Sequence, residues 1–273
     1  MTYSYKTLIV DIRDSVAWMT MNRPERLNAL NGELATELLD VLERFTEDKS
    51  VLTVVLTGAG RAFCSGADIG GGGTIGTVDD GDEQPNRAFA GRHHLKNGLQ
   101  RIPVAMRALE KPIIAAVNGI AAGGGFDLAC AADIRVCAEG AQFTEIFTKR
   151  GLFPGTGGCY LLPRLVGTAK AAELIWLASR IDSGEAERIG LVSYVCPDET
   201  FDERVHDFAK RFAAGPPIAI SLAKASIYRA EHMELPAAMD FFATAESITL
   251  TSEDRTEGMK AFAEKREPQF HGR

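Results

Sequence analysis

The segment AAGGGFDLA, residues 121–129, places three glycines shortly before an acid, Asp127. The apolar run before the glycines predicts that a strand ends there and that a helix begins near Gly124. The first turn of a helix has free N–H groups and a partial positive charge, and such N–H groups can stabilise an oxyanion. A carboxylate nearby can move a proton. Close packing and helix-dipole stabilisation explain the same residues without any chemistry.

A second loop of similar design favours the chemical interpretation. In FCSGADI, residues 63–69, a strand ends in small residues and leaves the backbone N–H of Ala67 uncovered. Two loops at strand ends can each direct one N–H group at the same carbonyl oxygen. The pair of loops therefore indicates an oxyanion site more strongly than either loop does alone.

Apolar patterning predicts the elements that must position these loops. Near-continuous apolar runs at 51–58 and 111–119 indicate strands covered on both faces. Residues 28–48 carry apolar side chains at helical spacing, with Asn31 as the N-cap. Two strands meet in a turn at Asp14 and Ser15, and Pro103 is expected to bend or interrupt a helix over 86–110.

Strands alternate with helices up to about residue 198, and the remainder of the 273 residues is nearly all helical. This order predicts an α/β protein with a core at 1–199 and a C-terminal helical subdomain at 200–273.

Composition narrows the classes of partner. The formal net charge is −7 and no dense Lys/Arg cluster is present, which argues against nucleic-acid binding. The five cysteines are scattered and form no CxxC pair, so we expect reduced thiols and no metal site. No signal peptide and no apolar run of about 18 residues is evident, so we expect a cytoplasmic protein with no membrane span.

Five motifs in a fixed order carry a resemblance to a known family. They are NRPERLNALN, VVLTGAGRAFCSGADI, KPIIAAVNGIAAGGGFDLACAADIRVCAEGAQF, GLFPGTGG and LPRLVGTAKAAEL. Together they resemble the crotonase, or enoyl-CoA hydratase/isomerase, superfamily along nearly the entire chain. The resemblance implies a spiral of ββα turns, with C-terminal helices that build a homotrimer or a dimer of trimers. It also implies an acyl-CoA thioester substrate, with coenzyme A as part of that substrate and no further cofactor.

The resemblance also assigns expected roles. The N–H groups of Ala67 and Gly124 match the two oxyanion donors, and Asp127 matches an acid/base position. The positions that match coenzyme A contacts are Glu25, Arg26, Leu27, Gly66, Asp68 and Ile69, together with Phe262 and Lys265, which reach a neighbouring subunit's ligand. For Arg26 and Lys265 the alternative is ordinary solvated surface charge.

Two other acid positions of the family are not acidic here. The second glutamate of the hydratases falls on Phe147, and the acid that some isomerases place after the proline falls on Gly155. Several alternatives remain for the groups that transfer protons. Asp127 acting alone, as in a double-bond shift, is one. Glu145 in place of the missing acid is another, provided that the backbone shifts. The others are the loop acids Asp79, Asp80, Asp82 and Glu83, and the histidines His93 and His94 at the start of the next helix.

The sequence thus predicts an acyl-CoA enzyme that works through a stabilised enolate. Four phenylalanines near the motifs fit either an apolar acyl pocket or core packing: Phe126, Phe143, Phe147 and Phe153. The alternatives are an isomerase or hydrolase rather than a hydratase, and a catalytically weak acyl-CoA-binding scaffold. A nucleotide-binding reading of VLTGAGRAF is weaker, because Phe63 stands where that fingerprint needs its third glycine.

Overall fold

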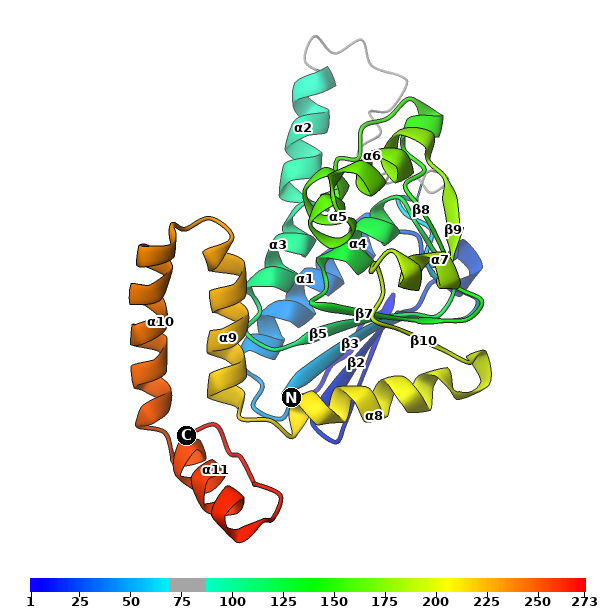
Figure 1. Cartoon of the computed structure of the whole chain (residues 1–273). Coiled ribbons are helices and arrows are strands. Elements are labelled where there is room, and N and C mark those ends of the chain that lie inside the picture. The colour runs from blue at the N-terminus through cyan, green and yellow to red at the C-terminus, as the bar shows by residue number, and fades with distance from the viewer. Residues whose placement is uncertain (69–86) are drawn as a thin grey trace.

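The computed structural model describes residues 1–68 and 87–273 (Figure 1). Ile69 and the loop acids at 79–83 lie outside the described residues.

Two sheets form the framework. The larger sheet has the order β1-β2-β3-β5-β7-β10, with β1 antiparallel to β2 and the other pairs parallel. Its strands are Leu8–Arg13, Val16–Met21, Thr53–Gly58, Ile113–Val117, Ile134–Ala138 and Tyr194–Cys196. The smaller sheet has the order β4-β6-β8-β9, and its strands are Ala62–Cys64, Ile120–Ala122, Gln142–Thr144 and Arg180–Asp182.

From β3 to β8 the chain alternates between the two sheets. β3, β5 and β7 enter the larger sheet, and each is followed by a three-residue strand of the smaller one. Helices connect one such pair of strands to the next, which is the predicted spiral of ββα turns. The strand ends expected before the two glycine loops are those of β4 and β6. β9 was missed, because three residues are too few to show a period.

The turn and the helix cap expected near the N-terminus are both present. Asp14 and Ser15 have φ values of 51° and 59° and join Arg13 to Val16 in the β1–β2 hairpin. Helix α1, Gly32–Glu47, begins after Asn31, whose side chain accepts a hydrogen bond from the Leu34 N–H at 2.9 Å.

A helix interruption is present, but not at Pro103, where the sequence predicted it. The segment forms two helices, α2 (Arg87–Asn97) and α3 (Arg101–Ala108), and residues 98–100 between them are not helical. Pro103 lies in the first turn of α3, where a backbone N–H has no intrahelical acceptor and a proline costs little.

The main core lies between the two sheets and α1, α3 and α4, and α8 covers the outer face of the larger sheet with Val205 and Ala209. The remaining helices are α4 (Gly124–Ala131), α5 (Gly158–Val166), α6 (Thr168–Leu177), α7 (Ser183–Arg188), α8 (Phe201–Ala213), α9 (Pro217–Ala230), α10 (Leu235–Leu250) and α11 (Glu253–Glu264).

Figure 1 shows α9, α10 and α11 standing beside and below the sheets, whereas α8 runs along them. The predicted boundary at 199/200 stays a prediction. In the structure, the first helix after it packs on the sheet and the next three extend from it.

Candidate active site

Three neighbouring strands of the smaller sheet bring the candidate residues to one edge. β4, β6 and β8 are parallel and adjacent, so their carboxyl ends face the same way. Ala67 follows β4, Gly124 follows β6, and Glu145 follows β8. Ligands of open α/β sheets commonly bind at this edge.

The two glycine loops approach each other closely. Gly66 has a φ of +95°, and a methyl group on it would lie 2.8 Å from the Ala122 carbonyl oxygen and 3.4 Å from the Gly124 nitrogen. Position 66 therefore has neither the backbone conformation nor the space for a side chain. The structure brings Gly66 and Gly124 together, as the sequence motifs predict.

The two predicted N–H donors have no recorded internal acceptor. Within residues 1–68 and 87–273, no hydrogen bond is recorded for the N–H of Ala67 or of Gly124. Gly124 is the first residue of α4, so its N–H has no intrahelical partner. Both groups thus keep the hydrogen-bonding capacity that an oxyanion site needs.

The three glycines before Asp127 differ in how strictly the structure requires a glycine at each position. Gly123 has a φ of +51°, and its N–H donates to the Thr144 carbonyl at 2.9 Å, which ties the turn to β8. Gly125 packs so closely that an added methyl would lie less than 3.0 Å from the Cys64 carbonyl oxygen. Gly124 has more room, with 3.5 Å between its methyl position and the Thr156 hydroxyl.

Asp127 lies in the first turn of α4 with only 1% of its surface exposed. The Thr156 hydroxyl donates a hydrogen bond to Asp127 Oδ2. Because the same hydroxyl lies near the Gly124 methyl position, Thr156 links the acid to one predicted oxyanion donor.

A second acid, Glu145, completes the arrangement, and it is fully buried. A methyl group at Gly158 would lie less than 3.0 Å from both Asp127 Oδ1 and Glu145 Oε1, so both oxygens border the same small space. Glu145 directly follows β8 at the same edge and lies beside Asp127 without any backbone shift. That it replaces the missing acid stays a prediction.

Burial is the main influence on both acids. It raises the pKa of Asp127, against the opposing effects of Glu145, the Thr156 hydroxyl and the Gly158 amide. Burial, followed by the charge of Asp127, raises the pKa of Glu145 to about 11. Two carboxyl groups that share a dry site do not both ionise at neutral pH.

The two positions that lack an acid hold apolar groups or contact them. The Phe147 ring lies 3.5 Å from the methyl position of Gly123. A methyl group at Gly155 would lie 2.8 Å from Leu95 Cδ2 of α2, and the Gly155 carbonyl accepts a hydrogen bond from the Gln100 side chain at 2.8 Å.

The other proposed groups do not join Asp127. Phe126 and Phe143 are core residues with ring centroids 5.6 Å apart, so the packing explanation holds for them, whereas Phe153 is exposed. His93 is exposed on the later half of α2 rather than at its start, and the side chain of His94 lies outside the described residues.

The segment expected to contact coenzyme A lies against the glycine loop that holds Gly66. Leu30 N–H donates to the Gly66 carbonyl at 2.8 Å, and Asp68 N–H donates back to Leu30 at 3.0 Å. Glu25 and Arg26 are exposed, and Leu27 is half-buried with a φ of 50°.

Sequence reasoning missed two residues that hold this region. Arg23 makes an ion pair with the buried carboxylate of Asp68 at 2.7 Å, so that side chain is occupied within the protein. Asn28 is fully buried, and its amide donates to the carbonyls of Ala59 and Ala62 at 2.9 and 2.7 Å. A buried Asn carries no pattern of its own in one sequence, so only the structure reveals it.

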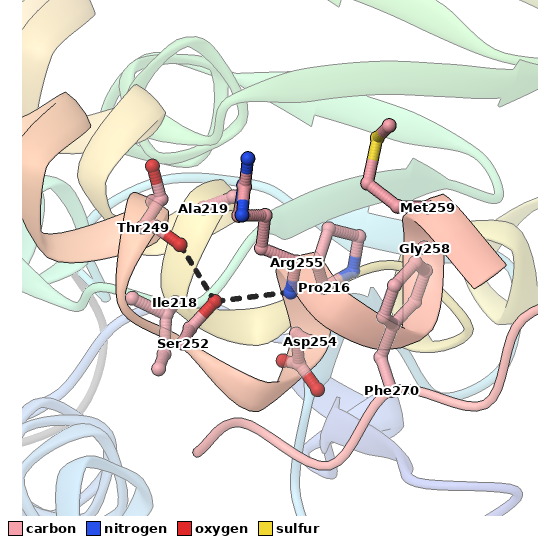
Figure 2. Close-up of a pocket in the computed structure, with 10 residues that line it drawn as sticks. All are labelled: Pro216, Ile218, Ala219, Thr249, Ser252, Asp254, Arg255, Gly258, Met259 and Phe270. Atoms are coloured by element: carbon pink, nitrogen blue, oxygen red, sulfur yellow. Dashed lines mark hydrogen bonds between the residues drawn. The ribbon is translucent and has the colours of Figure 1, made fainter.

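Phe262 lies on α11 and Lys265 directly follows this helix. Figure 1 shows α11 away from α4 in the single chain. Phe262 is 84% exposed, and Lys265 ends the helix with a φ of 53°. A separate cavity of about 260 Å³ lies between α9, α10 and α11. Figure 2 shows Met259 and Phe270 at its border, and none of the predicted coenzyme A contacts lines it.

Within the part of the chain that the structure describes, no group of three or more His, Cys, Asp or Glu side chains is arranged to hold a metal ion. No helix in that part is long and apolar enough to cross a membrane.

The fold and the site define a class: two sheets in a ββα spiral that bring two uncovered amides close to a buried acid. Comparison with known proteins identifies it. The family model for enoyl-CoA hydratase/isomerase matches residues 11–273, so the chain belongs to the enoyl-CoA hydratase/isomerase family. It is an enzyme of this lyase and isomerase type with a crotonase fold.

Individual relatives match this chain over nearly their full length. A probable enoyl-CoA hydratase of Rhodobacter capsulatus is 38% identical, over 99% of this chain and 100% of the relative. The 1,2-epoxyphenylacetyl-CoA isomerase of Escherichia coli is 34% identical, over 97% and 98%. The crystal structure of a putative enoyl-CoA hydratase from Streptomyces coelicolor has a TM-score of 0.90 at 38% identity, covering 100% of this chain and 97% of that one.

Proposed function

We propose that the enzyme shifts a double bond in an enoyl-CoA thioester. The N–H groups of Ala67 and Gly124 hold the thioester oxygen and stabilise the enolate. Asp127 takes a proton from carbon and returns it to another carbon of the same chain. The reaction conserves all atoms and needs neither water nor a cofactor.

One observation supports isomerisation over hydration. Hydration requires a second acid/base group to activate water, and the two further acid positions hold Phe147 and Gly155, whose side chains cannot transfer a proton. Glu145 is fully buried, and the proposed reaction gives it no contact with the substrate. A single proton-transferring carboxylate suits a double-bond shift, and the relative from Escherichia coli is named an isomerase.

The substrate's coenzyme A portion is proposed to follow the segment at 25–30 and the glycine loop that holds Gly66. Backbone groups of Glu25, Arg26, Leu27 and Gly66 are suited to this, and Asp68 contributes backbone only because its side chain is paired with Arg23. The contact of Ile69 with coenzyme A stays a prediction. The cytoplasmic location of the protein also stays a prediction.

We further propose that the chain assembles as a trimer or a dimer of trimers, so that Phe262 and Lys265 reach the ligand of a neighbouring subunit. Their exposure, and the separation of α11 from α4 within one chain, support this arrangement. Light scattering tests the assembly. Lys265→Ala should raise KM for the thioester with little change in kcat.

The test of the reaction compares Asp127→Asn with Glu139→Gln, a change at an exposed glutamate. Wild-type enzyme should convert 3-enoyl-CoA into 2-enoyl-CoA. Asp127→Asn should lose about 10²–10⁴-fold in kcat while thioester affinity stays within a few fold, and Glu139→Gln should match wild type. Full turnover by Asp127→Asn excludes Asp127 as the base. Hydration without isomerisation excludes the double-bond shift.

A further inference from the structure

The proposed mechanism uses Asp127 and leaves Glu145 without a role, although Glu145 is the most deeply buried acid at the site. Asp127 is 1% exposed and Glu145 is 0% exposed. Asp127 Oδ1 and both oxygens of Glu145 have no recorded N–H or O–H donor among the described residues. Buried carboxylate oxygens without donors are costly and call for an explanation.

No positive charge supplies that explanation. Among the residues that the structure describes, no Arg, Lys or His side chain forms a hydrogen bond or an ion pair with either carboxyl group. The other titratable groups facing the pair are the thiols of Cys130 in α4 and Cys159 in α5. Burial raises the pKa of both thiols, so they are neutral at ordinary pH and cannot offset a second negative charge.

A shared proton satisfies the pair. If one carboxyl group is protonated, it becomes an O–H donor to the other, which supplies a donor for one of the uncovered oxygens. The space under Gly158 has room for both oxygens because position 158 has no side chain. Asp127 already accepts a hydrogen bond from Thr156, whereas Glu145 accepts none, so the charge is better placed on Asp127.

We propose that Glu145 is a positioning residue that keeps one proton and donates it to Asp127, so that Asp127 remains charged and oriented as the base. Glu145 acts through Asp127 and does not touch the substrate. When Asp127 takes a proton from the substrate carbon, the pair briefly holds two protons and no charge, and Asp127 then returns its proton. This proposal rests on the proposed function of Asp127.

The first experiment is the pH profile of kcat for wild type, Glu145→Gln and Glu145→Leu, with Glu139→Gln and Glu139→Leu as controls. Glutamine keeps an N–H donor to Asp127, whereas leucine removes it. Loss of a donor to a charged carboxylate raises its pKa, so the acidic limb should move up by about one pH unit in Glu145→Leu. The limb should stay near its wild-type position in Glu145→Gln and in both controls.

Other outcomes overturn the proposal. A residue that only fills space would lower stability and leave the acidic limb in place in both Glu145 variants. If Glu145 were charged in the wild type, Glu145→Gln would move the limb to lower pH. Turnover by Asp127→Asn would instead remove the proposed function itself, so the two failures are distinguishable.

A second measurement does not depend on activity or on the leucine variant folding. Infrared spectra of the wild type at pH 8 should show the band of a protonated carboxylic acid, shifted in D₂O. The band should vanish in Glu145→Gln and persist in Glu139→Gln. Absence of the band in the wild type, or its persistence in Glu145→Gln, would contradict the assignment of the proton to Glu145.

Discussion

Two regions of the molecule hold enclosed acids that they treat in opposite ways: around Asp133, whose side chain is 17% exposed, and around Asp127 and Glu145, which are buried. Asp133, before β7, accepts hydrogen bonds from Lys224 Nζ at 2.7 Å, from the Tyr228 hydroxyl at 2.5 Å and from the Ile113 N–H at 2.7 Å. Lys224 and Tyr228 belong to α9, so this acid attaches the C-terminal helices to the sheet. Asp127 and Glu145 lie at the edge of the smaller sheet with three oxygens lacking a recorded donor.

The contrast separates a structural acid from a functional one. The carboxylate of Asp133 has the donors that a buried charge requires, and its role ends with attachment of α9. The pair of Asp127 and Glu145 has an unmet requirement for a proton. Such perturbed acids are typical of sites where protons are transferred.

Breaking the structural pair should have the largest effect on stability. Lys224→Met keeps the apolar stem but removes the buried cation, whose side chain is only 7% exposed, and leaves Asp133 partly unpaired. We expect the free energy of unfolding to fall by about 3 kcal/mol, with kcat nearly unchanged, measured by urea denaturation. Lys149→Met changes an exposed lysine and is the matched control. Equal stability of the two variants would contradict the structural role of Lys224.

Filling the space under the functional pair should have the next effect. Gly158→Ala places a methyl group less than 3.0 Å from an oxygen of each acid. We expect a loss of about 2 kcal/mol in stability from overpacking and about a hundredfold loss in kcat, because a small displacement of the base is costly. Gly32→Ala is the control, since nothing lies within 4 Å of its methyl position. A fully active Gly158→Ala variant would show that the pair tolerates displacement.

The last expected change has the opposite sign. In the unfolded chain Glu145 loses its proton near its ordinary pKa of 4.5, whereas in the fold its pKa is about 11. Between these values the folded state holds one more proton than the unfolded state, so wild-type stability falls as pH rises. Glu145→Gln removes this dependence and should therefore stabilise the protein at pH 8.

The comparison with pH 4 sharpens that prediction. There Glu145 is largely protonated in both states, so the gain from Glu145→Gln should nearly disappear, whereas Glu139→Gln should have no effect at either pH. Unfolding curves at the two values provide the measurement. Destabilisation by Glu145→Gln at pH 8 would mean that the folded protein holds this carboxylate charged.

Much of the fold was predictable because its signals are local. Apolar runs marked β3 and β5, Asn31 marked the start of α1, and Asp14 with Ser15 marked the hairpin. The strand β9 was missed, because three residues show no period. The interruption assigned to Pro103 was misplaced because a proline is tolerated in the first turn of a helix.

The candidate site divides in the same way. The sequence by itself determined the two glycine loops, Asp127 and the loss of acids at Phe147 and Gly155, because each is a matter of residue type at a fixed place in a motif. Tertiary structure alone decided that Glu145 joins Asp127, that Gly158 leaves room for both, and that Arg23 occupies Asp68. These contacts join residues 13 to 45 positions apart through the alignment of parallel strands and the loops after them, and no local pattern encodes such an alignment.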